Sequence, residues 1–302
     1  RRMSISHEPA RLGLTDARLI ELELKSVEYR RAILEFVVHA KAGHTGGSLS
    51  AVDILNVLYN AVMDITPENW ESLDRDHYIQ SKGHSVEALY VVLADRGFIP
   101  EADLLTGARY GSHMIGHPTR KVRGVEHNTG GLGHGLGISV GLALASKLDS
   151  RRSRTYCLLG DGELAEGSNW EAAMSAAHYE LDNLVAIIDR NHLQISGNTE
   201  DVIRLEPLAE KWTAFGWTVR EVPGHDLRRL AEAIGGDPED SRPTLVIADT
   251  VKGRGISFIE GQASWHHHVP TAEEHQQAIA ELEARAAELE ANDTGGHGGA
   301  TY

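Results

Sequence analysis

Residues 155–191 read TYCLLGDGELAEGSNWEAAMSAAHYELDNLVAIIDRN, and this segment indicates the fold class. Two short apolar runs, Thr155–Leu159 and Leu184–Asp189, have the length and composition of buried strands. The residues between them, 166–179, have the pattern of a helix. Apolar strands joined by a helix are typical of parallel sheets covered on both faces. We therefore predict an α/β fold with a doubly wound, mostly parallel sheet and helices on both faces.

Polar groups follow both predicted strands at the point where each ends. Gly-Asp-Gly occupies 160–162, and Asn191 follows the second strand. The carboxyl ends of neighbouring parallel strands meet at the edge where such folds bind ligands. We expect oxygens of Asp161, Asn191 and the Leu193 carbonyl to hold Mg²⁺ beside a diphosphate, although the same set would accept Ca²⁺ or Mn²⁺. The Gly162 N–H would approach a phosphate; the alternative is an ordinary turn and a strand-end cap.

The rest of the chain continues the alternation of strands and helices. Further helices are expected over 15–40, 53–63, 86–95, 138–148, 205–215 and 226–234, and further strands over 76–80, 217–222 and 245–249. The glycine-rich segments 42–50 and 107–137 are expected to be loops, and long loops of this kind usually form active sites. We divide the chain into an N-terminal arm (1–14), an α/β domain (15–270), a charged peripheral helix (271–292) and a disordered tail (293–302).

Charge and composition exclude several classes of function. Lys and Arg total 29 against 44 Asp and Glu, and the resulting net charge of −15 disfavours nucleic acid and anionic membranes as partners. A hydrophobic fraction of 41% is enough for a large core. The single Cys157 permits neither an internal disulfide nor a cysteine-rich zinc site. Because no apolar run resembles a signal peptide or a membrane span, we expect a cytoplasmic protein.

Histidines stand in four glycine-bearing or aromatic loop segments: His44, His84, His117 and His266. Neutral imidazole exchanges protons and imidazolium contacts phosphate, so this set suits a carbonyl reaction on a phosphorylated ligand. The triplet at 266–268 has an alternative interpretation, an adventitious metal-binding run, for its second and third members. The segment GGLG at 130–133 allows close backbone approach to a flat ring, with Leu132 as an apolar contact.

Five motifs in order resemble the diphosphate-binding half of transketolase: GHTGGSLS at 43–50, SKGHS at 81–85, GHPTRKVRGVEHNTGGLGHGL at 116–136, GDGELAEG at 160–167 and DRNHLQISG at 189–197. The resemblance runs from about residue 20 to 275. It implies an enzyme that uses thiamine diphosphate and a divalent ion, usually Mg²⁺. Its reaction in carbohydrate metabolism would transfer a two-carbon ketol unit from a ketose phosphate to an aldose phosphate.

The resemblance also implies roles for individual residues. Asp161, Asn191 and the Leu193 carbonyl match metal ligands. The implied cofactor contacts are His84, Gly130, Leu132, Gly162, Glu163 and His266. The implied catalytic residues are His44, His117 and His266, which handle substrate protons, and Glu166, which belongs to a proton network at the subunit interface.

Departures from the family pattern resemble split transketolases, in which two chains share the work. Thr45 and Gly131 replace prolines, and Arg190 stands where an acid is common. No segment after 275 could form the pyrimidine-binding domain, which in the family carries the activating glutamate and the arginines that hold substrate phosphate. We therefore predict activity only with a C-terminal partner subunit, in an α2β2 heterotetramer.

Two other interpretations are open. The chain could be the α subunit of another thiamine diphosphate enzyme, such as a 2-oxo acid dehydrogenase or decarboxylase, although the GHTGG, KGH and GHP histidines argue against it. It could also be a non-catalytic stabilising subunit, although intact Asp161 and Asn191 argue against that. The donor and acceptor sugars are left open by the sequence.

Overall fold

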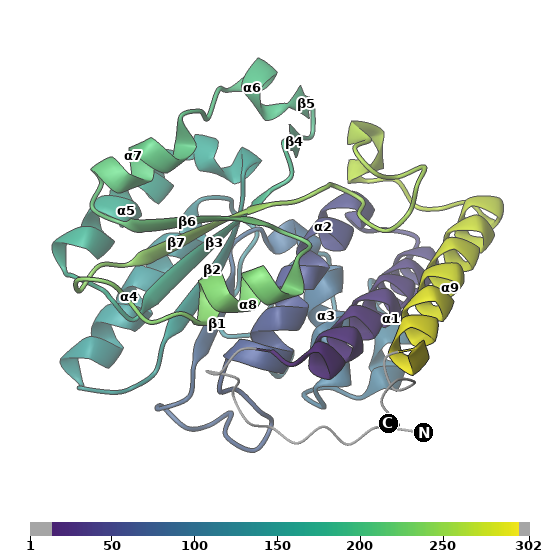
Figure 1. The fold of residues 1–302 in the computed structure, drawn as a ribbon, viewed down its shortest axis with the longest axis horizontal. Coiled ribbons are helices and arrows are strands. Elements are labelled where there is room, and N and C mark those ends of the chain that lie inside the picture. Colours follow the sequence, from purple (N-terminus) through teal and green to yellow (C-terminus); the bar gives the residue numbers. More distant parts are fainter. Residues whose placement is uncertain (1–13, 296–302) are drawn as a thin grey trace, which may run out of the picture.

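The computed structural model describes residues 14–295, which form a five-stranded parallel sheet between two layers of helices (Figure 1). The strand order is β1-β2-β3-β7-β6. The strands are β1 (His77–Gln80), β2 (Thr155–Gly160), β3 (Leu184–Arg190), β6 (Thr218–Pro223) and β7 (Thr244–Asp249). The predicted α/β class is confirmed, and each predicted strand is present with its ends shifted by at most one residue.

The central strands are apolar throughout because both of their faces are covered. Leu158 pairs with Ile187 across β2 and β3, and both side chains belong to the core on one side of the sheet. The next pair, Leu159 and Ile188, belongs to the core on the other side. This alternation follows from the two-residue period of a strand. It explains why the strands read as continuous hydrophobic runs.

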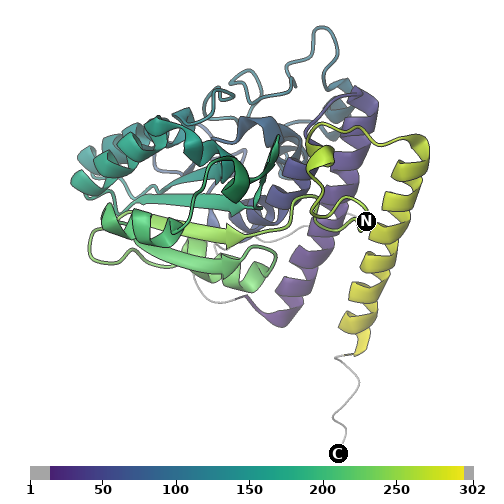
Figure 2. The ribbon, with the colours of Figure 1, turned by 90° about the horizontal axis from the view of Figure 1, so that it is seen from above.

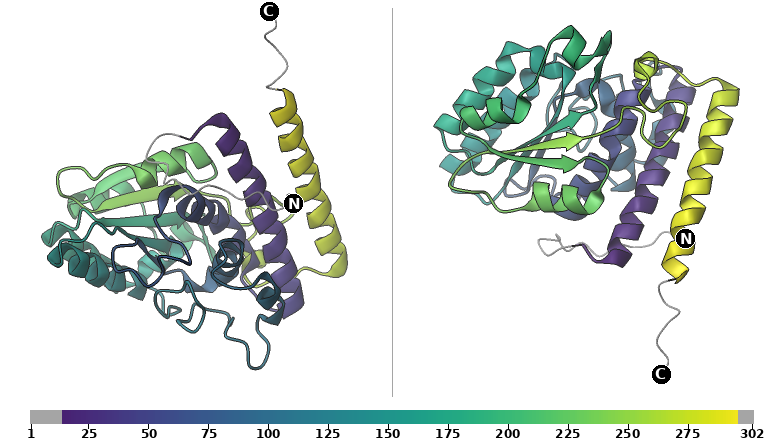
Figure 3. Two further views of the ribbon diagram at one scale, coloured as in Figure 1. Left: turned by 90° about the horizontal axis from the view of Figure 1, so that it is seen from below. Right: turned by 45° about the horizontal axis from the view of Figure 1, so that its top comes forward.

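The helices divide between the two cores. One side carries α4 (His134–Leu148), α5 (Gly167–His178) and α7 (Leu208–Ala214). The other side carries α1 (Asp16–Ala40), α2 (Thr45–Val57), α3 (Val86–Asp95), α8 (Leu227–Gly235) and α9 (Ala272–Gly295). Figures 2 and 3 show α9 running alongside α1 at the periphery. No helix within 14–295 has both the length and the apolar character needed to cross a membrane.

Helix α2 corrects the expectation of a loop over 42–50 followed by a helix from 53. The helix begins at Thr45 and is buried at every position. A Cβ at Gly46 would lie 3.0 Å from the Trp265 carbonyl oxygen, so this helix requires a small residue where another segment packs closely. Tertiary packing overrides the weak helix propensity of glycine here. The segment continues as a π-helical turn, Leu58–Val62.

Smaller differences concern segment ends and connections. Helix α7 is shorter than predicted, and a short helix, α6 (Thr199–Val202), precedes it together with the antiparallel pair β4 (Leu193–Gln194) and β5 (Gly197–Asn198). Between Thr106 and His134 the chain forms neither helix nor strand, which agrees with the predicted loop. Helix α4 begins at His134, four residues before the predicted start at 138. Residues 293–295 of the predicted tail are the last of α9. The remaining tail and the arm before Leu14 lie outside the described residues.

Candidate active site

A cavity of about 430 Å³ opens at the carboxyl edge of the sheet. It is lined by every residue predicted for the site except Glu166: His44, His84, His117, Gly130, Leu132, Asp161, Gly162, Glu163, Asn191, Leu193 and His266. Four loops and several strand ends contribute to this set. A separate cavity of about 500 Å³ between α1 and α9 contains none of them.

The predicted metal ligands follow two adjacent strands. Asp161 is buried after β2, where its Oδ1 accepts the Gly162 N–H at 2.7 Å and its Oδ2 accepts the His192 N–H at 2.6 Å. Asn191 follows β3, and its Oδ1 accepts the Leu193 N–H at 3.2 Å. These backbone bonds fix the turn that carries the predicted oxygen ligands.

The charge around Asp161 favours a cation. Burial, followed by the nearby charge of Asp189, raises the pKa of Asp161, and the Arg190 guanidinium 3.2 Å from Oδ2 offsets this only in part. A divalent ion would relieve the remaining cost of burying a carboxylate. Because the predicted donors are all oxygens, the residues fit Mg²⁺.

Two lysines that the sequence patterns do not single out line the same cavity. Lys82 follows β1 and forms a buried ion pair with Asp189. Lys252 lies beyond the end of β7, with its Nζ 2.9 Å from His266 Nδ1. Burial, then the charge of Lys82, lowers the pKa of Lys252 to about 8. The available signals were the position of Lys82 inside SKGHS and of Lys252 just past a strand end at the predicted edge.

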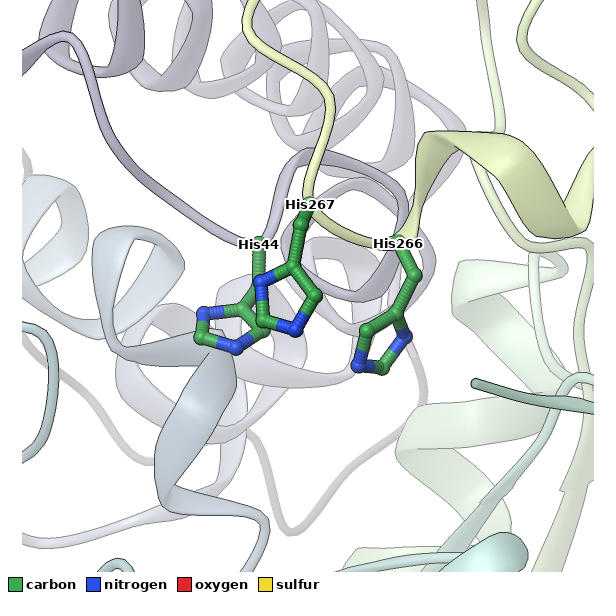
Figure 4. A group of neighbouring side chains, drawn as sticks. All are labelled: His44, His266 and His267. Carbon is green, nitrogen blue, oxygen red and sulfur yellow. The ribbon is translucent and has the colours of Figure 1, made fainter. Parts of the chain in front are cut away.

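The four predicted histidines come together in one cluster. The ring centroid of His44 lies 5.3 Å from that of His84, 6.1 Å from that of His117 and 5.4 Å from that of His266. Figure 4 shows His44 and His266 with a further neighbour, His267. The cluster therefore joins residues separated by more than two hundred positions in sequence.

These imidazoles are neutral at neutral pH. Burial, then the charges of His267 and His117, lowers the pKa of His44 to about 3. Burial, then the charge of Lys252, lowers the pKa of His266 to about 3. Burial also lowers the pKa of His84 and of His117. Neutral rings of this kind can accept a proton from a substrate hydroxyl.

Two glycines bring backbone close to the cavity. Gly130 has φ +146°, and a Cβ there would lie 3.0 Å from His117 Cδ2. A Cβ at Gly162 would lie 2.9 Å from the Gln194 Cβ. A larger residue at either position would have to displace these neighbours, so both glycines keep the wall open for a flat or phosphorylated ligand.

Glu163 holds one wall of the cavity in place. Its buried carboxylate accepts the Gly133 N–H at 2.9 Å, the Gly160 N–H at 3.0 Å and the Ser81 hydroxyl. These bonds tie the 130–133 segment to the end of β2. The carboxylate expected to contact a cofactor is thus engaged with the protein itself.

Glu166 lies outside the cavity. It is exposed at the start of α5, next to Gly133, where a Cβ would lie 2.6 Å from the Glu166 Cβ. It is the one predicted catalytic residue that the fold does not bring into the cluster.

Comparison with known proteins identifies the family of this chain. The family described as "Transketolase, thiamine diphosphate binding domain" matches residues 23–286. An apulose-4-phosphate transketolase subunit from Phocaeicola vulgatus is 48% identical over 275 residues, covering 91% of this chain and 98% of that protein. A 6-deoxy-6-sulfo-D-fructose transketolase subunit from a Clostridium strain is 39% identical over 270 residues, covering 89% of this chain and 98% of that protein.

A solved structure of a transketolase has the same fold. A transketolase variant from Pichia stipitis superposes with a TM-score of 0.78 at 29% identity, covering 90% of this chain and 44% of that one. The chain thus spans less than half the length of that transketolase and nearly the full length of the two similar subunits. It belongs to the transketolase family, in which it corresponds to the thiamine diphosphate-binding domain.

Proposed function

We propose that this chain is the cofactor-binding subunit of a two-chain transketolase, which transfers a ketol unit from a ketose phosphate to an aldose phosphate. The observation that carries the proposal is the cavity in which Asp161 and Asn191 meet five histidines and two lysines. Neither a plain turn nor a stabilising scaffold needs this combination of groups at one sheet edge.

The residues around the cavity divide into a metal end and a diphosphate region. Asp161, Asn191 and the Leu193 carbonyl would hold Mg²⁺, with Ca²⁺ or Mn²⁺ as substitutes. His84 and His266 would contact the diphosphate, together with Lys82 and Lys252. The Gly162 N–H, which donates to Asp161 Oδ1 in the structure, would join them once the metal engages that oxygen. When bound, thiamine diphosphate supplies the nucleophilic carbon that carries the ketol group. Gly130 and Leu132 would lie against its rings.

The neutral histidines would do the proton chemistry. His44, His117 and His266 line the cavity, and their lowered pKa values keep the rings neutral, so each can hydrogen-bond a substrate hydroxyl and pass its proton on. Glu163 would act as a positioning residue, because its carboxylate holds the 130–133 segment. Glu166 would act from the subunit surface, in contact with groups of another chain.

A second polypeptide would complete the site. Two relatives of matching length are named as subunits of a transketolase, which supports a partner for this chain. We propose that the partner supplies the pyrimidine-binding domain in a cytoplasmic α2β2 assembly. One relative is named for a ketose phosphate and another for a sulfonated ketose, so the donor is expected to be an anionic ketose.

The test measures ketol transfer by the chain alone and with the C-terminal partner, in the presence of thiamine diphosphate and Mg²⁺. Xylulose 5-phosphate and apulose 4-phosphate serve as donors, with ribose 5-phosphate and glyceraldehyde 3-phosphate as acceptors. We expect turnover only when both chains are present. Turnover by this chain alone would refute the two-chain arrangement, and decarboxylation of a 2-oxo acid would place the pair in another thiamine diphosphate class. Failure of the pair to bind the cofactor would favour a stabilising role.

A further inference from the structure

His267 has no role in the proposed reaction, yet it lies within the histidine cluster. Its ring centroid is 4.2 Å from that of His44 and 4.6 Å from that of His266. One ring nitrogen from each of the three residues lies within 4.8 Å of the others. Figure 4 shows the three rings converging from two segments, one before α2 and one at the end of the 3₁₀ turn Ala263–His266.

The separation of these nitrogens is close to what one metal ion requires. A zinc–imidazole bond is about 2.1 Å long, so two nitrogens on a tetrahedral ion lie about 3.4 Å apart. His267 is exposed, so its ring can rotate to close the remaining distance. In addition, the buried Nδ1 of His44 has no hydrogen-bond partner within residues 14–295. The three ring nitrogens therefore lie near the separation that one ion requires, and His44 Nδ1 is a buried polar atom that no described group satisfies.

The two segments that carry the rings are bound to each other. The Thr45 hydroxyl donates to the His268 carbonyl at 2.7 Å, which links the residues directly after His44 and His267. Glu87 is buried and accepts the His44 backbone N–H at 3.1 Å. A site whose ligand segments are already joined loses little freedom when an ion binds.

His268 is not part of this group, although it adjoins His267 in sequence. Its Nε2 lies 3.0 Å from Glu274, and its ring packs on Trp265 at a centroid distance of 4.2 Å. The fold therefore separates His268 from the other two histidines of the triplet, and His44 is the third member of the cluster. The potential ligand set is three imidazoles without a carboxylate.

We propose that His44, His266 and His267 form a binding site for one transition-metal ion of the zinc class, separate from the Mg²⁺ site, and that this ion blocks the place where the histidines would meet the donor sugar. Imidazole nitrogens select Zn²⁺, Co²⁺, Ni²⁺ and Cu²⁺, whereas the oxygens near Asp161 select Mg²⁺. Because two of the three ligands are the proposed proton carriers, an ion bound there inhibits by competing with the donor sugar. Metal binding itself does not depend on the proposed reaction.

The first test is a titration of the full-length chain with Co²⁺, followed by visible absorption, with Zn²⁺ as the displacing ion. We expect one tight ion per chain and a spectrum of low-symmetry nitrogen coordination. His267→Gln should weaken Zn²⁺ binding about tenfold or more, because a three-ligand site loses one ligand. His113→Gln, which removes an exposed histidine elsewhere, is the matched control. Equal Co²⁺ spectra and affinities in the two variants would overturn the proposal.

The second test uses the assembled enzyme with saturating Mg²⁺. Zn²⁺ should raise the apparent KM for the donor sugar in the wild type and in His113→Gln, but much less in His267→Gln. Inhibition that is the same in all three, or that changes only kcat, contradicts a competitive ion at this site. If the pair lacks ketol transfer, the Co²⁺ titration still decides the metal site, so the two proposals fail independently.

Discussion

Lys252 makes cofactor affinity depend on pH in a way that can be measured. In the free protein its amine is charged below about pH 8 and neutral above it, because burial, then Lys82, lowers its pKa. A diphosphate favours the charged form, so affinity for thiamine diphosphate should fall as the pH rises through about 8. Isothermal titration with Mg²⁺ across this range measures the effect.

Two variants test the assignment of that pH dependence. Lys252→Met should weaken binding about tenfold at neutral pH, since a partly buried charge contact is lost, and should flatten the profile. Lys252→Arg should keep a charged group throughout and extend tight binding to higher pH. An unchanged pH profile in Lys252→Met would assign the titration to another group.

Asp161 allows a second prediction at the level of one carboxylate. Asp161→Ala should abolish Mg²⁺-dependent binding of thiamine diphosphate, because it removes the buried charge and leaves Arg190 facing the metal position. Asp249→Ala is the control, since this exposed carboxylate ends β7 at the same sheet edge but pairs with His192. Comparable loss in both variants would mean that general charge, not coordination, governs binding.

At the scale of an element, ion pairs between Glu126 and the two residues Arg75 and His77 hold the long segment between Thr106 and α4 to β1. Glu126 accepts from Arg75, and its carboxylate lies 2.7 Å from His77 Nδ1. Burial raises the pKa of Glu126, but the hydrogen bonds and charges of His77 and Arg75 lower it to about 2. Because the folded pKa lies below the unfolded value, this stabilisation is complete above about pH 4.5 and is lost as the pH falls toward 2.

Glu126→Gln should therefore lower the free energy of unfolding by about 2 kcal/mol at neutral pH. The difference from wild type should shrink below about pH 4.5, where the wild-type carboxylate begins to lose its advantage. Urea unfolding at several pH values measures this difference, and Glu28→Gln at an exposed position of α1 is the control. A constant difference at all pH values would mean that shape rather than charge accounts for the effect.

The elements also show what the sequence could and could not predict. Hydrophobic runs predicted all five strands of the main sheet, but not the short pair β4 and β5, and the strand ends placed Asp161 and Asn191 at one edge. The first part of α2, from Thr45, was missed because its glycines are explained only by the Trp265 segment that packs on it. The contacts of Lys252 and His267 with the other histidines were missed because these neighbours come from distant loops. Contacts made by tertiary packing are thus the part that sequence patterns do not contain.

At the scale of the whole molecule, the cavity places two lysines together in a chain whose overall charge is strongly negative. The chain carries −15, yet the cavity contains Lys82 and Lys252 beside the histidines. The tips of β1, β2, β3 and β7 deliver these groups to one edge, with the acids near Asp161 at the metal end. A long-range charge therefore keeps the protein away from polyanions, while a short-range arrangement attracts a small diphosphate.

Glu166 tests whether the whole assembly, not this chain alone, completes the site. It is exposed and outside the cavity, so a catalytic effect must pass through a neighbouring chain. In the two-chain enzyme, Glu166→Gln should lower kcat on the order of 100-fold, because it removes an ionisable member of a proton network. Binding of Mg²⁺ and thiamine diphosphate should change little, since none of the cavity residues is altered.

Steady-state kinetics and calorimetry on the same preparation separate these effects, and Glu210→Gln at an exposed position of α7 is the control. An unchanged kcat would remove Glu166 from the reaction, whereas a loss of cofactor binding equal to the loss of kcat would give it a structural role.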